Sequence, residues 1–129
     1  MKVTKKLRAK FLFWTISKRL NFGGEAVNIN DFKKFWLEDK VHLTNHGLKR
    51  IESRDISIDD VGNCIMNGEI IEEYPDDYPH PSALIFGRKL TGEIIHVVCG
   101  IDEEILYFIT AYEPNTEKFM EDLRTRRKK

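Results

Sequence analysis

The segment SALIFGRKLTGEIIHVVCGIDEEILYFITAY, which spans residues 82–112, decides the fold that the sequence predicts. Its apolar runs are separated by two short polar breaks, at 91–92 and at 102–104, which are typical of turns between strands. The run at 93–101 is apolar on both faces, so we expect it to be a central strand. Because such short connections join antiparallel neighbours, the segment predicts three consecutive strands of a meander.

The regions around this segment predict one more strand and three helices. Residues 69–74 have the pattern of a fourth strand, and the loop at 75–81 is too rich in proline to join a ladder. Helical periodicity precedes them at about 45–54 and at 57–67. Residues 116–127 are predicted to be a final helix with a cationic last turn. The expected fold class is α+β, with helices followed by a four-stranded antiparallel meander and a C-terminal helix.

The first forty residues differ in composition from the rest of the chain. Residues 1–22 contain seven lysines or arginines and no acidic residue. Phe32, Phe35 and Trp36 then recur at helical spacing. We therefore expect a basic N-terminal extension with a short aromatic helix over residues 1–40 and a single α+β domain over 41–129. Basic ends permit contact with nucleic acid, although charged ends are usually only solvated.

Composition and motifs exclude several classes of function. The chain has 21 basic and 21 acidic residues, and its two cysteines, Cys64 and Cys99, lie in apolar patterns typical of reduced core residues. The apolar run at 11–16 is too short for a signal peptide or a membrane span, so we expect a cytoplasmic protein with no membrane partner. Motifs for nucleotide triphosphates, dinucleotides, serine hydrolases and zinc are missing from the sequence, so no cofactor and no metal ion is expected.

Three basic residues share one face of the helix predicted at 45–54. At 100° per residue, His46, Arg50 and Arg54 fall at about 0°, 40° and 80° around the axis, beside the buried side. Arginines four residues apart repel one another and are costly to desolvate, so anions are expected opposite this basic stripe. These anions are either carboxylates of the same chain or phosphate groups, which match the guanidinium geometry. The candidate carboxylates are Glu72, Glu73 and Asp77.

A fourth candidate, His96, lies in the predicted central strand. A histidine there is either a hydrogen-bonded core residue or a second titratable group that faces the stripe. Cleavage of RNA without a metal needs a group that titrates near neutral pH and cations that stabilise the phosphorane. His46, His96 and the two arginines could supply both. Thr110 and Tyr112 could offer hydroxyls to a ligand, because simple alternation places residues 106, 108, 110 and 112 on one face.

Several motifs, taken together, resemble a bacterial family of domains of unknown function. They are a histidine followed by arginines four and eight residues later at 46–54, NGEIIEEYPDD at 67–77, PHPSALI at 79–85, IHVV at 95–98 and ITAYEP at 109–114. The resemblance covers about residues 42–115. The sequence departs from the family pattern at Gly47, where alanine is expected, and at Ala83, where cysteine is expected.

This resemblance implies a function and a partner. Members of the family are often encoded beside zinc-finger antitoxins of the MqsA/YgiT type. They look like distant relatives of the BrnT and RelE toxins, which are metal-independent ribonucleases. The resemblance thus implies a RelE/BrnT-like fold and a toxin-like endoribonuclease of a toxin–antitoxin system, with RNA as substrate and a zinc-finger antitoxin as partner. His46 or His96 would activate the ribose 2′-hydroxyl, and Arg50 and Arg54 would hold the scissile phosphate.

A second hypothesis is a non-catalytic protein-binding domain. Its acidic stretch at 69–77, or a free sheet edge, would receive the partner. If His96 and the stripe converge on one open cationic cleft, the ribonuclease hypothesis is favoured. Pairing of both stripe arginines with carboxylates of the chain would favour a structural role.

Overall fold

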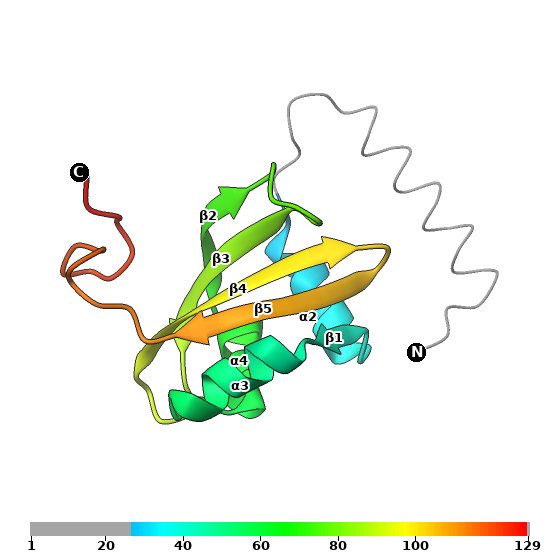
Figure 1. Cartoon of the computed structure of the whole chain (residues 1–129), viewed down its shortest axis with the longest axis horizontal. Helices are drawn as coiled ribbons and strands as arrows, with labels where there is room; N and C mark the ends of the chain where they lie inside the picture. The colour runs from blue at the N-terminus through cyan, green and yellow to red at the C-terminus, as the bar shows by residue number, and fades with distance from the viewer. Residues whose placement is uncertain (1–26, 129) are drawn as a thin grey trace.

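The structure, a computed structural model, describes residues 27–128. This part of the chain contains three helices, α2 (Ile29–Leu37), α3 (Asn45–Ser53) and α4 (Ile58–Asn67), and five strands, β1 (Val41–Leu43), β2 (Glu69–Tyr74), β3 (Ser82–Arg88), β4 (Ile94–Asp102) and β5 (Ile105–Tyr112) (Figure 1). The predicted α+β class is confirmed. Within the described residues, no helix has both the length and the apolar character needed to cross a membrane.

The strands form one mixed sheet in the order β1-β5-β4-β3-β2. The four predicted strands, β2 to β5, each pair antiparallel with the next strand in sequence. The sheet differs from the prediction because β1 adds a fifth strand, which runs parallel to β5 with Val41 opposite Leu106. This pairing places the start of α3 beside β5, and α3 packs along that strand.

The predicted C-terminal helix at 116–127 is wrong. Residues 115–128, which we call the C-terminal strap, form turns and one short bridge. Asn115 and Asp122 each accept hydrogen bonds from backbone N–H groups two and three residues further along, at 2.9–3.4 Å. Such local bonds compete with those of a helix, so the strap follows the sheet as a series of turns.

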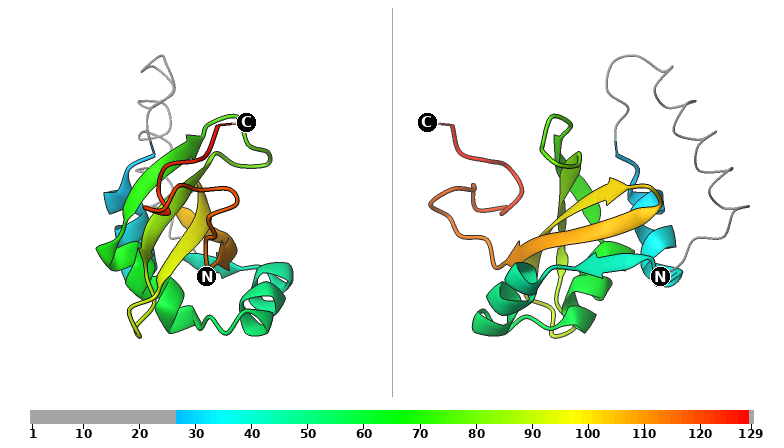
Figure 2. Two further views of the ribbon diagram at one scale, coloured as in Figure 1. Left: turned by 90° about the vertical axis from the view of Figure 1, so that its left-hand side faces the viewer. Right: turned by 45° about the vertical axis from the view of Figure 1, so that its right-hand side comes forward.

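The two faces of the sheet are covered differently. The strap lies on the side of the sheet opposite α2 (Figure 2). On the helical side, α4 packs against β3 and β4. The buried core on that side includes Phe32 and Phe35 from α2, Ile51 from α3 and the free cysteines Cys64 and Cys99. The reduced core cysteines predicted from the sequence are thus free and buried in the structure.

A bulge in β5 makes the predicted alternation on this strand wrong. Cys99 of β4 pairs with Phe108, while the residue before Cys99 pairs with Thr110, so Ile109 is an extra residue. An extra residue moves the side chains that follow to the other face. Phe108 is therefore buried among the helices, whereas Tyr112 contacts His96 on the strap side.

Candidate functional site

Helix α3 carries the basic stripe on its exposed side. The helix begins after Thr44, whose hydroxyl accepts a hydrogen bond from the third residue on (2.9 Å). It buries Ile51 in the core. These two contacts fix the rotation of the helix, so His46, Arg50 and Arg54 are all exposed, whereas the spacing predicts a shared face beside the buried side.

The stripe residues have different surroundings. Arg54 reaches the end of β5, where its Nη1 donates to the carbonyl oxygen of Ala111 (2.8 Å) and to the hydroxyl of Thr110 (3.3 Å). The side chains of His46 and Arg50 have no hydrogen-bond or ion-pair partner among residues 27–128.

None of the acids considered as internal partners pairs with the stripe. Glu72 is held by Arg126, and Asp77 accepts a hydrogen bond from Ser82. Glu73 has no ion pair in the described part of the chain. Among residues 27–128, an internal salt-bridge seam therefore does not explain the stripe, because none of these carboxylates neutralises its positive charge.

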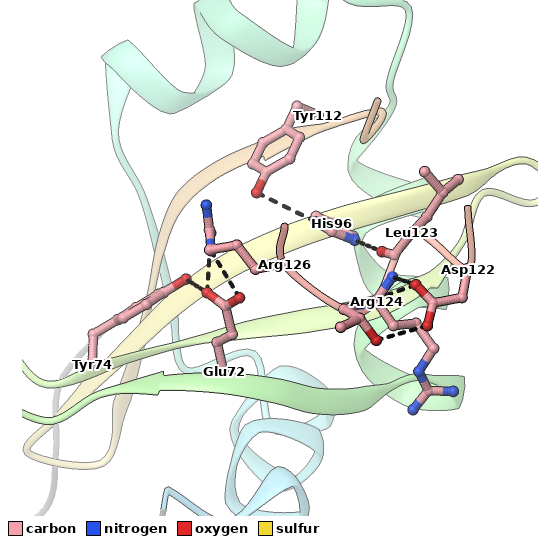
Figure 3. Close-up of polar contacts among 9 residues, drawn as sticks. Glu72, Tyr74, His96, Tyr112, Asp122, Leu123, Arg124 and Arg126 are labelled. Carbon is pink, nitrogen blue, oxygen red and sulfur yellow. Dashed lines mark hydrogen bonds and ion pairs between the residues drawn. The ribbon is translucent and has the colours of Figure 1, made fainter. Parts of the chain in front are cut away.

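His96 is a fully buried residue of β4 that is held from both sides (Figure 3). Its Nε2 lies 2.7 Å from the carbonyl oxygen of Leu123, and its Nδ1 lies 3.3 Å from the hydroxyl of Tyr112. A carbonyl oxygen only accepts, so Nε2 carries the proton, and in the neutral ring Nδ1 accepts from Tyr112. Burial lowers the pKa of His96 and keeps the ring neutral near pH 7. His96 therefore reaches a ligand only through Tyr112.

A pocket of about 580 Å³ opens beside Tyr112, where α3, β5 and the strap meet. Its lining residues are Arg54, Tyr112, Glu113, Asn115, Lys118, Phe119 and Arg126. Three of them are cationic, and the single acid, Glu113, lies 3.6 Å from Lys89. Burial raises the pKa of Tyr112, so its hydroxyl keeps its proton at neutral pH and donates to the histidine. The pocket combines excess positive charge with a phenol whose hydroxyl is hydrogen-bonded to a neutral imidazole.

Arg126 is fixed in the pocket by a carboxylate from β2 (Figure 3). Its Nε and Nη2 each lie 3.0 Å from an oxygen of Glu72, which also accepts a hydrogen bond from Tyr74 (2.6 Å). Burial alone would raise the pKa of Glu72, but the bonds from Arg126 and Tyr74 outweigh burial and lower it. Because Arg126 is already paired, the free positive charge of the pocket comes from its other two cations.

The structure brings together two of the four predicted site residues. Arg54 lines the pocket, and His96 lies directly behind Tyr112. His46 and Arg50 continue the same face of α3 but do not line the pocket.

The strap contributes pocket residues that the sequence reasoning missed. The sequence predicts a helix at Lys118 and Arg126, but the structure places both at the pocket, and Arg126 is held there by Glu72 of the distant strand β2. The only signal was the basic composition of the last residues. Among residues 27–128, no three His, Cys, Asp or Glu side chains are grouped as metal ligands would be.

Comparison with known proteins gives the family of the chain. A comparison with curated proteins finds no match. A family model described as "Domain of unknown function (DUF4258)" matches residues 43–113, which is more than half of the chain. The match includes Arg54, His96 and Tyr112 but not the strap that completes the pocket. The chain therefore belongs to the DUF4258 family of domains of unknown function.

Proposed function

We propose that this domain is a metal-independent endoribonuclease that binds an RNA phosphate in the pocket beside Tyr112. One observation carries the proposal: the Tyr112 hydroxyl belongs to a cationic pocket and lies 3.3 Å from the neutral Nδ1 of His96. A phenol in this position can accept a proton from a ligand while it passes its own proton to the buried ring. The volume of about 580 Å³ is in the range of pockets that hold small organic ligands, such as one nucleotide.

The proposed reaction uses three groups of the pocket. Arg54 and Lys118 hold the scissile phosphate and stabilise the charge that develops on its oxygens. The ribose 2′-oxygen attacks phosphorus as its proton moves to Tyr112, whose own proton moves to Nδ1 of His96. The bond to the 5′-oxygen breaks, and this oxygen takes a proton from the Lys118 ammonium. The products are a 2′,3′-cyclic phosphate and a free 5′-hydroxyl.

The rest of the basic stripe extends this binding surface. His46 and Arg50 are exposed on the helix face that leads to Arg54. Unpaired cations in a row favour the repeated charge of a nucleic-acid backbone. We assign them to the phosphates that flank the cleaved one, and His46 remains the alternative base suggested by the sequence.

The proposal also includes a biological role for the ribonuclease. The resemblance to RelE and BrnT toxins suggests a toxin of a toxin–antitoxin system with a zinc-finger antitoxin as its inhibitor. An antitoxin that covers the pocket would block both the stripe and Tyr112. This assignment rests on resemblance and not on the geometry of the pocket.

The direct test uses a labelled single-stranded RNA in excess chelator. We expect cleavage that leaves 2′,3′-cyclic phosphate ends and that stops when the nucleotide at the cleavage site is 2′-deoxy. Arg54→Ala should abolish cleavage, while Arg88→Ala, which removes an exposed arginine outside the pocket, should not. Activity that needs a divalent ion, or that survives Arg54→Ala, would contradict the proposal. Loss of cleavage in His46→Ala with full activity in Tyr112→Phe would move the base to His46.

The second candidate, a protein-binding domain, is favoured by one observation. β2 lies at the end of the strand order, and among the described residues it pairs with β3 alone. An edge strand can accept a strand from a partner. In this case wild-type protein would not cleave RNA, and a chain that binds the β2 edge would protect the amides of β2 from hydrogen exchange.

A further inference from the structure

An apolar groove lies on the helical side of the molecule, away from the pocket beside Tyr112. It has a volume of about 360 Å³ and is lined by Trp36 from α2, by Asp59, Gly62, Asn63 and Met66 from α4, and by Leu90 from the β3–β4 turn. The indole of Trp36 lies directly on Gly62, where even a Cβ atom would come within 2.7 Å of the ring. α2 and α4 therefore form one continuous wall of this groove.

One strongly exposed apolar side chain lines the apolar groove, and two more are next to its lining residues in sequence. Leu90, which lines it, is 66% exposed. Leu37 and Ile58 directly adjoin lining residues in sequence and are 71% and 40% exposed. These are three of the six large hydrophobic side chains that are exposed in the described part of the chain. An apolar concentration of this kind marks a surface that another segment covers.

The charges at the apolar groove also restrict its occupant. Asp59 lines it, and its carboxylate has no partner among residues 27–128. No lining residue is basic. An occupant that places aromatic or aliphatic side chains between cationic ones would match this surface.

The chain itself contains such a segment. Residues 11–16 read FLFWTI, and they are flanked by Lys10 on one side and by Lys18 and Arg19 on the other. Ten residues, 17–26, separate this segment from Val27. Fully extended, ten residues reach about 33 Å, whereas the nine residues of α2 span only about 13 Å. The connection is long enough for residues 11–16 to reach the Trp36 end of α2.

We propose that the apolar groove is the docking site of residues 11–16 of the same chain. The aromatic side chains of this segment would cover Trp36, Met66 and Leu90, and a flanking cation would approach Asp59. The basic N-terminal extension would thereby become part of the folded unit. This inference is independent of the proposed ribonuclease activity.

Disulfide trapping in the full-length chain tests the docking. Thr15→Cys introduces a thiol without removing an apolar residue of the segment, and Leu90→Cys places the second thiol at the apolar groove. The native cysteines, Cys64 and Cys99, are fully buried and do not compete. The matched control pairs Thr15→Cys with Tyr78→Cys, because Tyr78 is 95% exposed in a distant loop.

We expect the intramolecular bond to Leu90→Cys to form at least tenfold faster than the bond to Tyr78→Cys. Adding Trp14→Asp should lower the first rate to that of the control. Equal rates in the two pairs, or no effect of Trp14→Asp, would overturn the proposal. Disulfide-linked dimers in place of the intramolecular bond would also overturn it, by assigning the apolar groove to a second copy.

Discussion

Replacing Phe119 by alanine should detach the C-terminal strap without unfolding the sheet. The side chain is only 1% exposed, and its ring packs edge-on against His96 with centroids 4.6 Å apart. The guanidinium of Arg126 lies 4.8 Å from the ring centroid. Removing a buried phenylalanine costs about 3–5 kcal/mol. We expect the lower value, about 3 kcal/mol, because the space beside the pocket refills with water. This corresponds to a roughly hundredfold increase in opening of the strap.

The loss of stability in Phe119→Ala should be confined to the strap because of where Phe119 lies. It does not belong to the core cluster between helices and sheet. The other attachments of the strap include the bond between His96 and Leu123, the ion pairs of Arg124 and Arg126, and the guanidinium of Arg124 over the ring of Phe86. Ion pairs of exposed arginines contribute little, typically below about 1 kcal/mol. Without Phe119, the strap should open while the core remains folded.

Hydrogen exchange measured by mass spectrometry separates local from global opening. Within the strap, the backbone N–H of Met120 donates to the carbonyl oxygen of Thr125 (2.7 Å), and the N–H of Arg127 donates to the carbonyl oxygen of Lys118 (2.9 Å). In Phe119→Ala these amides should exchange roughly a hundredfold faster, while those of β4 and β5 stay protected. Met120→Ala is the matched control, since Met120 is the next residue and is 44% exposed.

Two results would refute this reasoning. If strap and sheet lost protection together, with Tm lower by more than about 10 °C, the strap would be part of the cooperative core. If exchange of the strap did not change, Phe119 would not hold it.

Three further predictions concern single residues. Burial lowers the pKa of His96 in the folded chain, so as the pH falls below about 6.5 the unfolded chain binds the proton first and acid destabilises the fold. His96→Gln should flatten this fall in the free energy of unfolding, as measured by urea titration at several pH values, and an unchanged slope would contradict the assignment. Gly47→Ala should lower Tm, although alanine is the better helix former. The added Cβ would lie 2.9 Å from Thr44 Oγ1 and 3.0 Å from the carbonyl oxygen of Ile109. A higher Tm would show that these neighbours can move. Ser57→Ala should lower the free energy of unfolding by about 1 kcal/mol, since the Ser57 side chain forms half of the capping box of α4; an unchanged urea midpoint would contradict this.

Local patterns were enough to predict most of the elements. The turn signals at 91–92 and 102–104 predicted three strands that the structure contains. The spacing of His46, Arg50 and Arg54 predicted one shared helix face beside the buried side, and in the structure all three residues are exposed. These features depend on neighbours in sequence, which a single chain displays directly.

The features that were missed depend on distant contacts. The bulge at Ile109 breaks the alternation of β5, and nothing in the local pattern of apolar residues marks it. The strap lies on the sheet because Phe119 packs against His96 of β4 and Arg126 pairs with Glu72 of β2, which are contacts distant in sequence. The pocket lies where these two features meet. The sequence could therefore suggest Arg54, His96 and the hydroxyl of Tyr112, but not that they share a site with Lys118 and Arg126 of the strap.

The central claim is that the Tyr112 hydroxyl transfers the proton during metal-independent RNA cleavage. The most direct measurement is the initial rate of single-stranded RNA cleavage in excess EDTA for wild type, Tyr112→Phe and Tyr107→Phe. Tyr107 is the matched control, because it is a tyrosine of the same strand that does not line the pocket. We predict that Tyr112→Phe lowers the rate by a factor of about 10²–10⁴, the usual contribution of a general base, and that Tyr107→Phe does not. Equal rates for the three proteins, or no cleavage by the wild type in chelator, would contradict the claim.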